Sequence, residues 1–310
     1  MKQQSKVWLI LIALWVINGS SFLAIKVSID TIPAFLSAGI RFSIAGGILY
    51  AVYYFQKKLE HQQEHIGRRQ WRDTLILAVT LFLGGQGLLT WGSQYISSGV
   101  TGLLNSTIPL WVAILAFILY KTKMTKMTIL GLIAGFSGLM LLIGPSIGSG
   151  TLNPIGVISL ILSSLFWAAG SLFSTKAKLP VSILASSGML MVTGGLIITL
   201  TSFILGEYSG LDLAQVSTQS WLALCYLIVI ITVVGFTDFY WLLRVTSASL
   251  ANTFAYVSPV IAVVLGWAIL HEPVDLVTIV AMIVILFGVA LMVTKSSSIK
   301  PKSPSIKRTS

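Results

Sequence analysis

Ten runs of about 20 apolar residues follow one another along this chain, and no other feature restricts its fold as strongly. A hydrocarbon core of about 30 Å is crossed by a helix of about 20 apolar residues. Alternating ten-residue segments, which are typical of membrane barrels, do not occur in the sequence, so helices are the spanning structure that remains. The predicted fold class is all-α, a polytopic membrane protein with ten transmembrane helices over 7–26, 33–55, 74–93, 97–119, 127–145, 153–175, 181–205, 219–243, 248–270 and 275–294.

The second half of the chain repeats the first. A shift of 150 residues superposes Trp71 on Trp221, Gly85 on Gly235, Trp91 on Trp241, Ser97 on Ser247, Pro109 on Pro259 and Gly138 on Gly288. A constant offset over about 70 residues indicates duplication. Because each unit has five helices, an odd number, the second unit starts on the side where the first ends, and the two repeats are inverted. We predict repeats at 1–146 and 147–294, followed by a disordered basic tail at 295–310.

The charged residues predict the orientation. Only 9% of the residues are charged, and the net charge is +11. In a ten-helix arrangement, 18 of the 20 basic residues fall on one side of the membrane, and Lys26 and Arg41 are the exceptions. This positive-inside bias predicts a multi-pass protein of the inner cell membrane with both termini in the cytoplasm. The tail is expected to contact anionic lipid. Basic residues scattered over short loops do not form the face that a nucleic-acid-binding domain needs, so no nucleic-acid partner is predicted.

Four short patterns occur in order along the chain. They are W-x-x-N-G-S at 15–20, A-G-I-R-F-x-x-A-G at 38–46, A-Y-V-x-P at 255–259 and H-E-P at 271–273. Together with the five-plus-five helix plan, they resemble the EamA family of the drug/metabolite transporter superfamily over about residues 7–294. The resemblance implies a bacterial or archaeal inner-membrane carrier, often an exporter of amino acids or related metabolites. It also implies a cavity lined mainly by the first, third, fourth, sixth, eighth and ninth helices.

Amides, hydroxyls and aromatic rings recur on single faces of these helices, as a site for a small zwitterion with an apolar side chain would use. Such residues also serve as ordinary interhelical contacts. The predicted substrate-binding residues are Trp15, Asn18, Phe22, Gln86, Asn105, Trp167, Ser171, Asn252 and Tyr256.

Two prolines and two charges inside apolar runs are the other candidates. Pro109 and Pro259 each deprive the carbonyl four residues earlier of its donor, which predicts a helix break lined by protein or a wet cavity. Arg41 requires water, a carbonyl or an acid nearby and could hold a carboxylate, although the repeat places Met189 at the equivalent position. Asp238 is a carboxylate deep in an apolar run and is the candidate for proton coupling, with a backbone partner or cytoplasmic water as the alternative.

The leading hypothesis is an alternating-access exporter of small organic solutes with no cofactor and no metal. The alternatives are an intramembrane enzyme acting on lipid or peptide, and a non-transporting membrane partner subunit. An enzyme would need convergent His, Ser or acidic residues at one depth, and the apolar runs offer no His. The H-x-x-E-H pattern at 61–65 matches inverted zinc proteases but lies in a polar loop without a third ligand in reach. Neither the solute nor the oligomeric state follows from the sequence.

Overall fold

The computed structural model describes residues 2–60, 66–148, 152–246, 250 and 253–293, and the regular elements in these ranges are all helical. The elements of the first half are α1 (Lys2–Ser28), α2 (Ala34–Glu60), α3 (Arg68–Leu77), η1 (Ala78–Gly87), α4 (Leu88–Gly92), α5 (Ser98–Asn105), α6 (Ile108–Tyr120) and α7 (Lys126–Gly148). Those of the second half are α8 (Pro154–Ser174), α9 (Ile183–Ile204), η2 (Glu207–Gly210), α10 (Thr218–Tyr226), η3 (Leu227–Val234), α11 (Gly235–Val245), α13 (Phe254–Leu270) and α14 (Leu276–Val293).

Eight helical stretches in the described residues are long and apolar enough to cross a membrane, and α13 and α14 are shorter apolar helices. These ten segments coincide with the ten predicted runs, so the predicted fold class is confirmed. Large apolar side chains cover the outer surface of the bundle, among them Leu9, Phe55, Ile133, Ile204 and Phe287, each at least 59% exposed. Such a surface fits a lipid environment, where exposed apolar side chains carry no hydration cost.

Two of the spans contain π-helix, in which the hydrogen bonds run from residue i to i+5. In the third span the π-helical part is η1, and in the eighth it is η3. The 150-residue offset relates these two segments, so the π-helices belong to the repeat. The sequence analysis did not predict them. Gly84, Gly85 and Gly87 lie in η1.

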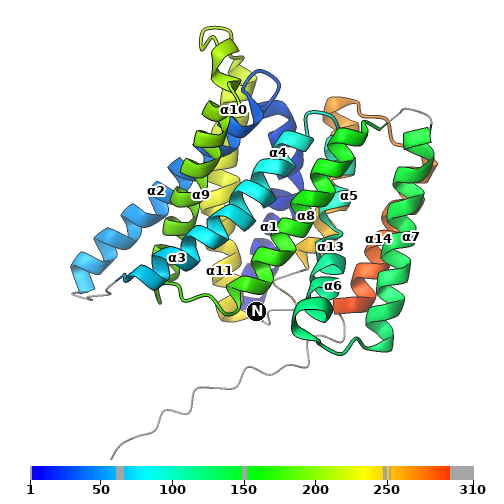
Figure 1. Ribbon diagram of the computed structural model, residues 1–310, viewed down its shortest axis with the longest axis horizontal. Coiled ribbons are helices and arrows are strands. Elements are labelled where there is room, and N and C mark those ends of the chain that lie inside the picture. The colour runs from blue at the N-terminus through cyan, green and yellow to red at the C-terminus, as the bar shows by residue number, and fades with distance from the viewer. Residues whose placement is uncertain (1, 61–65, 149–151, 247–249, 251–252, 294–310) are drawn as a thin grey trace, which may run out of the picture.

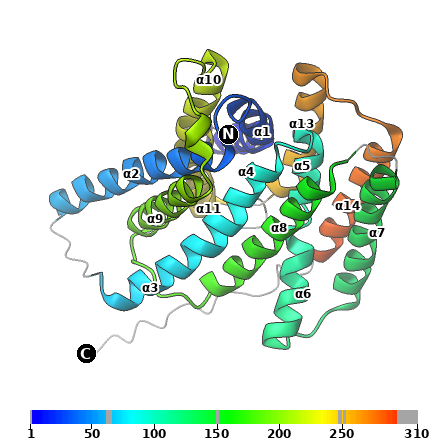
Figure 2. The ribbon, with the colours of Figure 1, turned by 45° about the horizontal axis from the view of Figure 1, so that its top comes forward.

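Helix packing follows the inverted repeat. Helix α2 packs along α9, and α7 along α14, and these two pairs lie at opposite edges of the molecule (Figures 1 and 2). In the centre, α1 contacts α13 and the α10–η3–α11 span, while its counterpart α8 contacts the α5–α6 and α3–η1–α4 spans. These central contacts of α1 and α8 are therefore equivalent, with the roles of the two repeats exchanged.

The inversion is also visible in the helix ends. Helices α6 and α13 both end in a left-handed cap, at Lys121 with φ 54° and at His271 with φ 53°. These residues are 150 positions apart, yet the connections that follow them lie at opposite ends of the bundle, the α6–α7 connection at the bottom of Figure 1 and the α13–α14 connection at the top.

Glycines allow α2 and α9 to approach until their backbones touch. A Cβ placed on Gly46 would lie 2.6 Å from the backbone nitrogen of Val192, and one placed on Gly188 would lie 2.8 Å from that of Tyr50. Gly47, the next residue on α2, faces open space. Small residues at such interfaces are a general means of packing helices in lipid.

The two neighbouring glycines provide a matched test of this interface. Leucine at Gly46 must push α9 away, and over-packing of this kind costs about 1–3 kcal/mol, whereas leucine at Gly47 projects into open space. We expect Gly46→Leu to lower the melting temperature of the detergent-solubilised protein by several degrees and Gly47→Leu to leave it near the parent value. Equal melting temperatures for the two variants would contradict the close α2–α9 contact.

Candidate functional site

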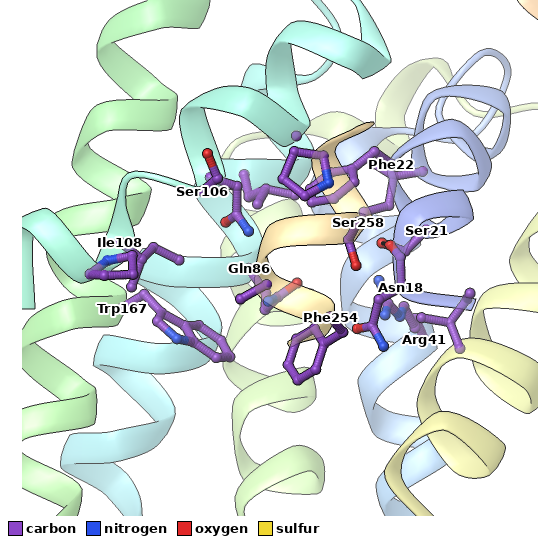
Figure 3. Close-up of a pocket in the computed structure, with 18 residues that line it drawn as sticks. Asn18, Ser21, Phe22, Arg41, Gln86, Ser106, Ile108, Trp167, Phe254 and Ser258 are labelled. Carbon is purple, nitrogen blue, oxygen red and sulfur yellow. Dashed lines mark hydrogen bonds between the residues drawn. The ribbon is translucent and has the colours of Figure 1, made fainter. Parts of the chain in front are cut away.

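A cavity of about 450 Å³ lies between the two repeats. This volume is in the range of small-molecule sites in proteins. Both repeats supply its walls, which are formed by Asn18, Ser21, Phe22, Ile25, Arg41, Gln86, Leu89, Gly102, Asn105, Ser106, Ile108, Pro109, Trp167, Ile231, Phe254, Ala255, Ser258 and Pro259 (Figure 3).

Interrupted helices create part of this space. Helix α5 ends at Asn105 and α6 begins at Ile108, with Pro109 as its second residue. Pro259 lies inside α13, where its missing N–H withdraws the usual donor from the carbonyl of Ala255. Helix α13 continues through Pro259 without a break, in contrast to the α5–α6 junction. Residues at both prolines line the cavity, where polar backbone can meet water or a guest instead of hydrocarbon.

One face of α1 forms a continuous wall. Asn18, Ser21, Phe22 and Ile25 follow one another at helical spacing and all line the cavity. The Asn18 side chain donates from Nδ2 to the carbonyl of Leu14 at 2.9 Å, and the Ser21 hydroxyl donates to the carbonyl of Asn18 at 2.6 Å. These intrahelical bonds fix the amide and the hydroxyl at the cavity surface.

Arg41 is the charged residue of the cavity wall. It is 7% exposed, and its Nε donates to Thr232 Oγ1 at 3.0 Å. Thr232 belongs to η3 and donates in turn to the carbonyl of Leu227, five residues earlier, at 2.8 Å. The guanidinium carbon also lies 4.7 Å from the centre of the Phe42 ring. The π-helix of the second repeat thus positions a cation carried by the first.

The structure brings together several of the residues predicted from sequence. Those that line the cavity are Asn18, Phe22, Gln86, Asn105, Trp167, Arg41, Pro109 and Pro259. Whether they bind a solute stays a prediction.

Other predicted residues lie elsewhere. Trp15 donates from Nε1 to Thr253 Oγ1 at 3.0 Å, so its indole contacts α13 outside the cavity. Tyr256 packs against the main hydrophobic core, and Ser171 lies on α8 one turn beyond Trp167. Asp238 is half-buried on α11 and is not among the described lining residues. Asn252, the 61–65 loop motif and the 295–310 tail lie outside the described residues.

Four polar or aromatic lining residues were missed in the sequence analysis, namely Ser21, Ser106, Phe254 and Ser258. Ser21 stands three residues after Asn18, and Ser258 directly precedes the helix-interior proline. Helical spacing and proximity to Pro259 were therefore the signals that could have identified these two.

Glu272 caps a helix that leads into the cavity. Its carboxylate accepts hydrogen bonds from the backbone N–H of Ser98 at 2.7 Å, the Ser98 hydroxyl at 2.8 Å and the backbone N–H of Gly99 at 3.2 Å. These are the free donors at the start of α5, where a negative charge is favourable.

Lys26 binds the segment just before that helix. Its Nζ lies 2.7 Å from the carbonyl oxygen of Ser93, 3.1 Å from that of Gln94 and 3.0 Å from that of Ile96. Lys26 of α1 and Glu272 of the α13–α14 connection therefore hold residues 93–99 from two sides, and we call this arrangement the Lys26/Glu272 cap. Lys26 directly follows Ile25 of the cavity wall.

Comparison with known proteins agrees with this architecture. The model of the EamA-like transporter family matches residues 5–144 and again 154–294. The uncharacterized inner membrane transporter YedA of Escherichia coli (strain K12) is 30% identical over 95% of this chain and 92% of its own length. The uncharacterized transporter YoaV of Bacillus subtilis (strain 168) is 27% identical over 92% of this chain and 95% of its own.

The fold of this chain is also similar to that of a solved structure. One crystal structure aligns with a TM-score of 0.60 at 17% identity, over 94% of this chain and 97% of that one. This match concerns the fold alone. The two family matches, one in each half, cover nearly the whole chain, and the protein belongs to the EamA-like transporter family.

Proposed function

We propose that this transporter moves small organic solutes across the inner cell membrane by alternating access, and that it exports amino acids or related metabolites. The observation that carries the proposal is the cavity between two inverted repeats, with side chains of both repeats in its wall. Two units of similar structure and opposite orientation can rock about such a central site and open it to each side in turn.

The two repeats meet at helix pairs that are equivalent under the inversion, such as α2 with α9 and α7 with α14. A rearrangement of one repeat against the other can therefore produce an inward-open and an outward-open state with similar contacts. An intramembrane enzyme would instead need reactive groups that converge on one point. The cavity wall holds amides, hydroxyls, one guanidinium and aromatic rings, which are groups that bind a solute.

The positive-inside bias assigns the end of the bundle that contains the Lys26/Glu272 cap to the outside. The cap then closes the outer end, and opening outward requires Glu272 to leave the start of α5. The repeat equivalent of Glu272 on the inner side is Thr122, which has no carboxylate. Lys176, the equivalent of Lys26, lies 3.7 Å from the centre of the Tyr120 ring. In the part of the chain that the structure describes, these two equivalent residues therefore form no such charged cap.

Exchange of a labelled solute across a bilayer tests the transport proposal. Proteoliposomes loaded with each member of a panel of amino acids and related metabolites should take up the same radiolabelled compound by counterflow, and liposomes without protein should not. The transporter proposal would be contradicted if no compound of the panel exchanged and the purified protein hydrolysed a lipid or peptide. That result would favour the intramembrane enzyme.

Asp238→Asn extends the same assay to energy coupling. Counterflow needs no coupling ion, so the variant should exchange solute like the parent. Uptake driven by an imposed pH gradient should be lost, because an amide carries no titratable proton. If gradient-driven uptake survives in Asp238→Asn, this carboxylate does not couple transport to protons.

Thiol labelling tests the Lys26/Glu272 cap. Cys225 is the one cysteine of the chain, so Cys225→Ser with Ser106→Cys places a single thiol in the cavity wall. Glu272→Gln weakens charged hydrogen bonds, each worth about 1.5–3 kcal/mol, and should raise labelling by an impermeant thiol reagent added outside intact cells about tenfold.

Asp212→Asn, in an exposed loop, is the matched charge control and should leave the labelling rate unchanged. Ile133→Cys on the outer surface of the bundle is the control for thiols that face lipid, and it should stay unlabelled with and without Glu272→Gln. Equal labelling of Ser106→Cys in the presence and in the absence of the Glu272→Gln substitution would contradict the outer closure.

A further inference from the structure

The cavity has an unbalanced charge. Arg41 is the only lining residue with a charged side chain, and the described lining residues include no Asp or Glu. A guanidinium remains protonated in proteins, so the described cavity wall carries one positive charge. Its walls are largely apolar and shield this charge less than bulk water does, and a solute of opposite charge is favoured there.

Most of the hydrogen-bonding capacity of Arg41 is unused. A guanidinium has five N–H donors. Within the part of the chain that the structure describes, only Nε is engaged, in its bond to Thr232 Oγ1 at 3.0 Å. Thr232 and the Phe42 ring fix the position of the group, and the N–H donors of its two terminal nitrogens remain for a guest. A planar pair of such donors matches the two oxygens of a carboxylate.

A buried hydroxyl adds to this polar end of the cavity. Ser258 is 5% exposed, and its Oγ has no hydrogen-bond partner among the described residues. An unpaired buried hydroxyl is unfavourable, and a ligand that supplies the missing partner removes this cost. In the close-up, Ser258 lies near Ser21, Asn18 and Arg41 on one side of the cavity (Figure 3).

The opposite side of the cavity holds large apolar side chains, together with the Ser106 hydroxyl (Figure 3). Trp167 and Ile108 lie there, across the cavity from Arg41, and the Phe254 ring lies between the two sides (Figure 3). Rings and aliphatic side chains bury the apolar part of a ligand at about 25 cal/mol per Å². The cavity therefore has its cation at one end and large aromatic and aliphatic side chains at the other, with neutral polar groups such as Gln86 and Ser106 away from the cation.

We infer that the transported solute is a small organic anion, with a carboxylate bound to Arg41 and Ser258 and an apolar body against Trp167. The inference rests on the proposed transport function and narrows its substrate class from amino acids and related metabolites to those carboxylates that carry a net negative charge. An ammonium group on the solute would find only neutral acceptors here, and its loss of hydration would go uncompensated by an opposite charge. A net anion is therefore preferred over a zwitterion of the same skeleton, and over a cation most strongly.

Four probes with one carbon skeleton separate these charge states. They are 3-phenylpropionate (anion), phenylalanine (zwitterion), 3-phenylpropionamide (neutral) and phenylalaninamide (cation). Each is titrated into the purified full-length protein in detergent, and binding is read from the rise in melting temperature and from quenching of tryptophan fluorescence. We expect the anion to bind about 10- to 100-fold more tightly than the neutral amide, which lacks a charge-assisted bond to Arg41.

Variants assign this preference to Arg41. Arg41→Gln should abolish the difference between acid and amide, whereas Arg41→Lys, which keeps the charge but not the paired donors, should retain a reduced difference. Arg69→Gln, the same charge change at an exposed site on α3, should bind all four probes like the parent. Ser258→Ala should weaken binding of the anion severalfold and leave the relative affinities of the neutral amide and the cation unchanged.

The proposal is overturned if the neutral, zwitterionic or cationic probe binds the parent protein as tightly as the anion, or if Arg41→Gln keeps the full preference for the acid. It is likewise overturned if further acid–amide pairs, such as hexanoate with hexanamide, give equal responses. These results differ from a failure of the transport function. A protein that exchanges a neutral or cationic solute across liposomes remains a transporter with a different substrate class.

Discussion

Every backbone polar group within the bilayer needs a hydrogen-bond partner from the protein or from enclosed water, and the rest of this structure depends on that constraint. The chain meets it with helices, and at several departures from regular helix a side-chain hydroxyl supplies a partner for a carbonyl. At the α5–α6 interruption, the Ser106 hydroxyl donates to the carbonyl of Leu103 at 2.7 Å and the Thr107 hydroxyl to that of Leu104 at 2.6 Å. Serines of α8 serve the same purpose for the third span.

Those α8 serines explain how a π-helix is stable beside the cavity. Ser163 donates to the carbonyl of Gly85 at 2.7 Å, and Ser159 donates to that of Leu88 at 2.8 Å. The neighbouring helix thus bonds to carbonyls in and just after η1, while in η3 the hydroxyl of Thr232 bonds within its own span. The irregular segment η1 also carries Gln86 of the cavity wall, and Thr232 of η3 holds Arg41, which α2 carries. The irregular helices and part of the polar character of the cavity thus have one physical origin.

This origin also explains what could be predicted from the sequence. The apolar runs and the 150-residue offset are properties of composition and order, and they sufficed for the ten helices and the inverted plan. Periodicity identified residues that share a face, such as Asn18 and Phe22, but it does not say which face meets the cavity. Trp15, on the same predicted face, bonds to Thr253 instead, and Tyr256 joins the core. A π-helix changes the rotation per residue, so phase cannot be carried through it by counting 3.6 residues per turn.

Positions where the two repeats differ explain how a nearly symmetric fold acquires a definite function. The counterparts of Arg41 and Thr232 are Met189 and Phe82, both buried and without charge, so the inversion supplies one cation to the cavity and not two. Glu272 likewise corresponds to Thr122. An exact inverted repeat would give its two conformations equal energies, because each would contain the other's contacts in reverse. Only positions at which the two repeats carry different residues can favour one conformation over the other, or a solute of one charge over another. Under the proposals made above, the symmetric contacts make two states accessible, while Arg41 selects the charge of the solute and Glu272 favours closure of the outer side.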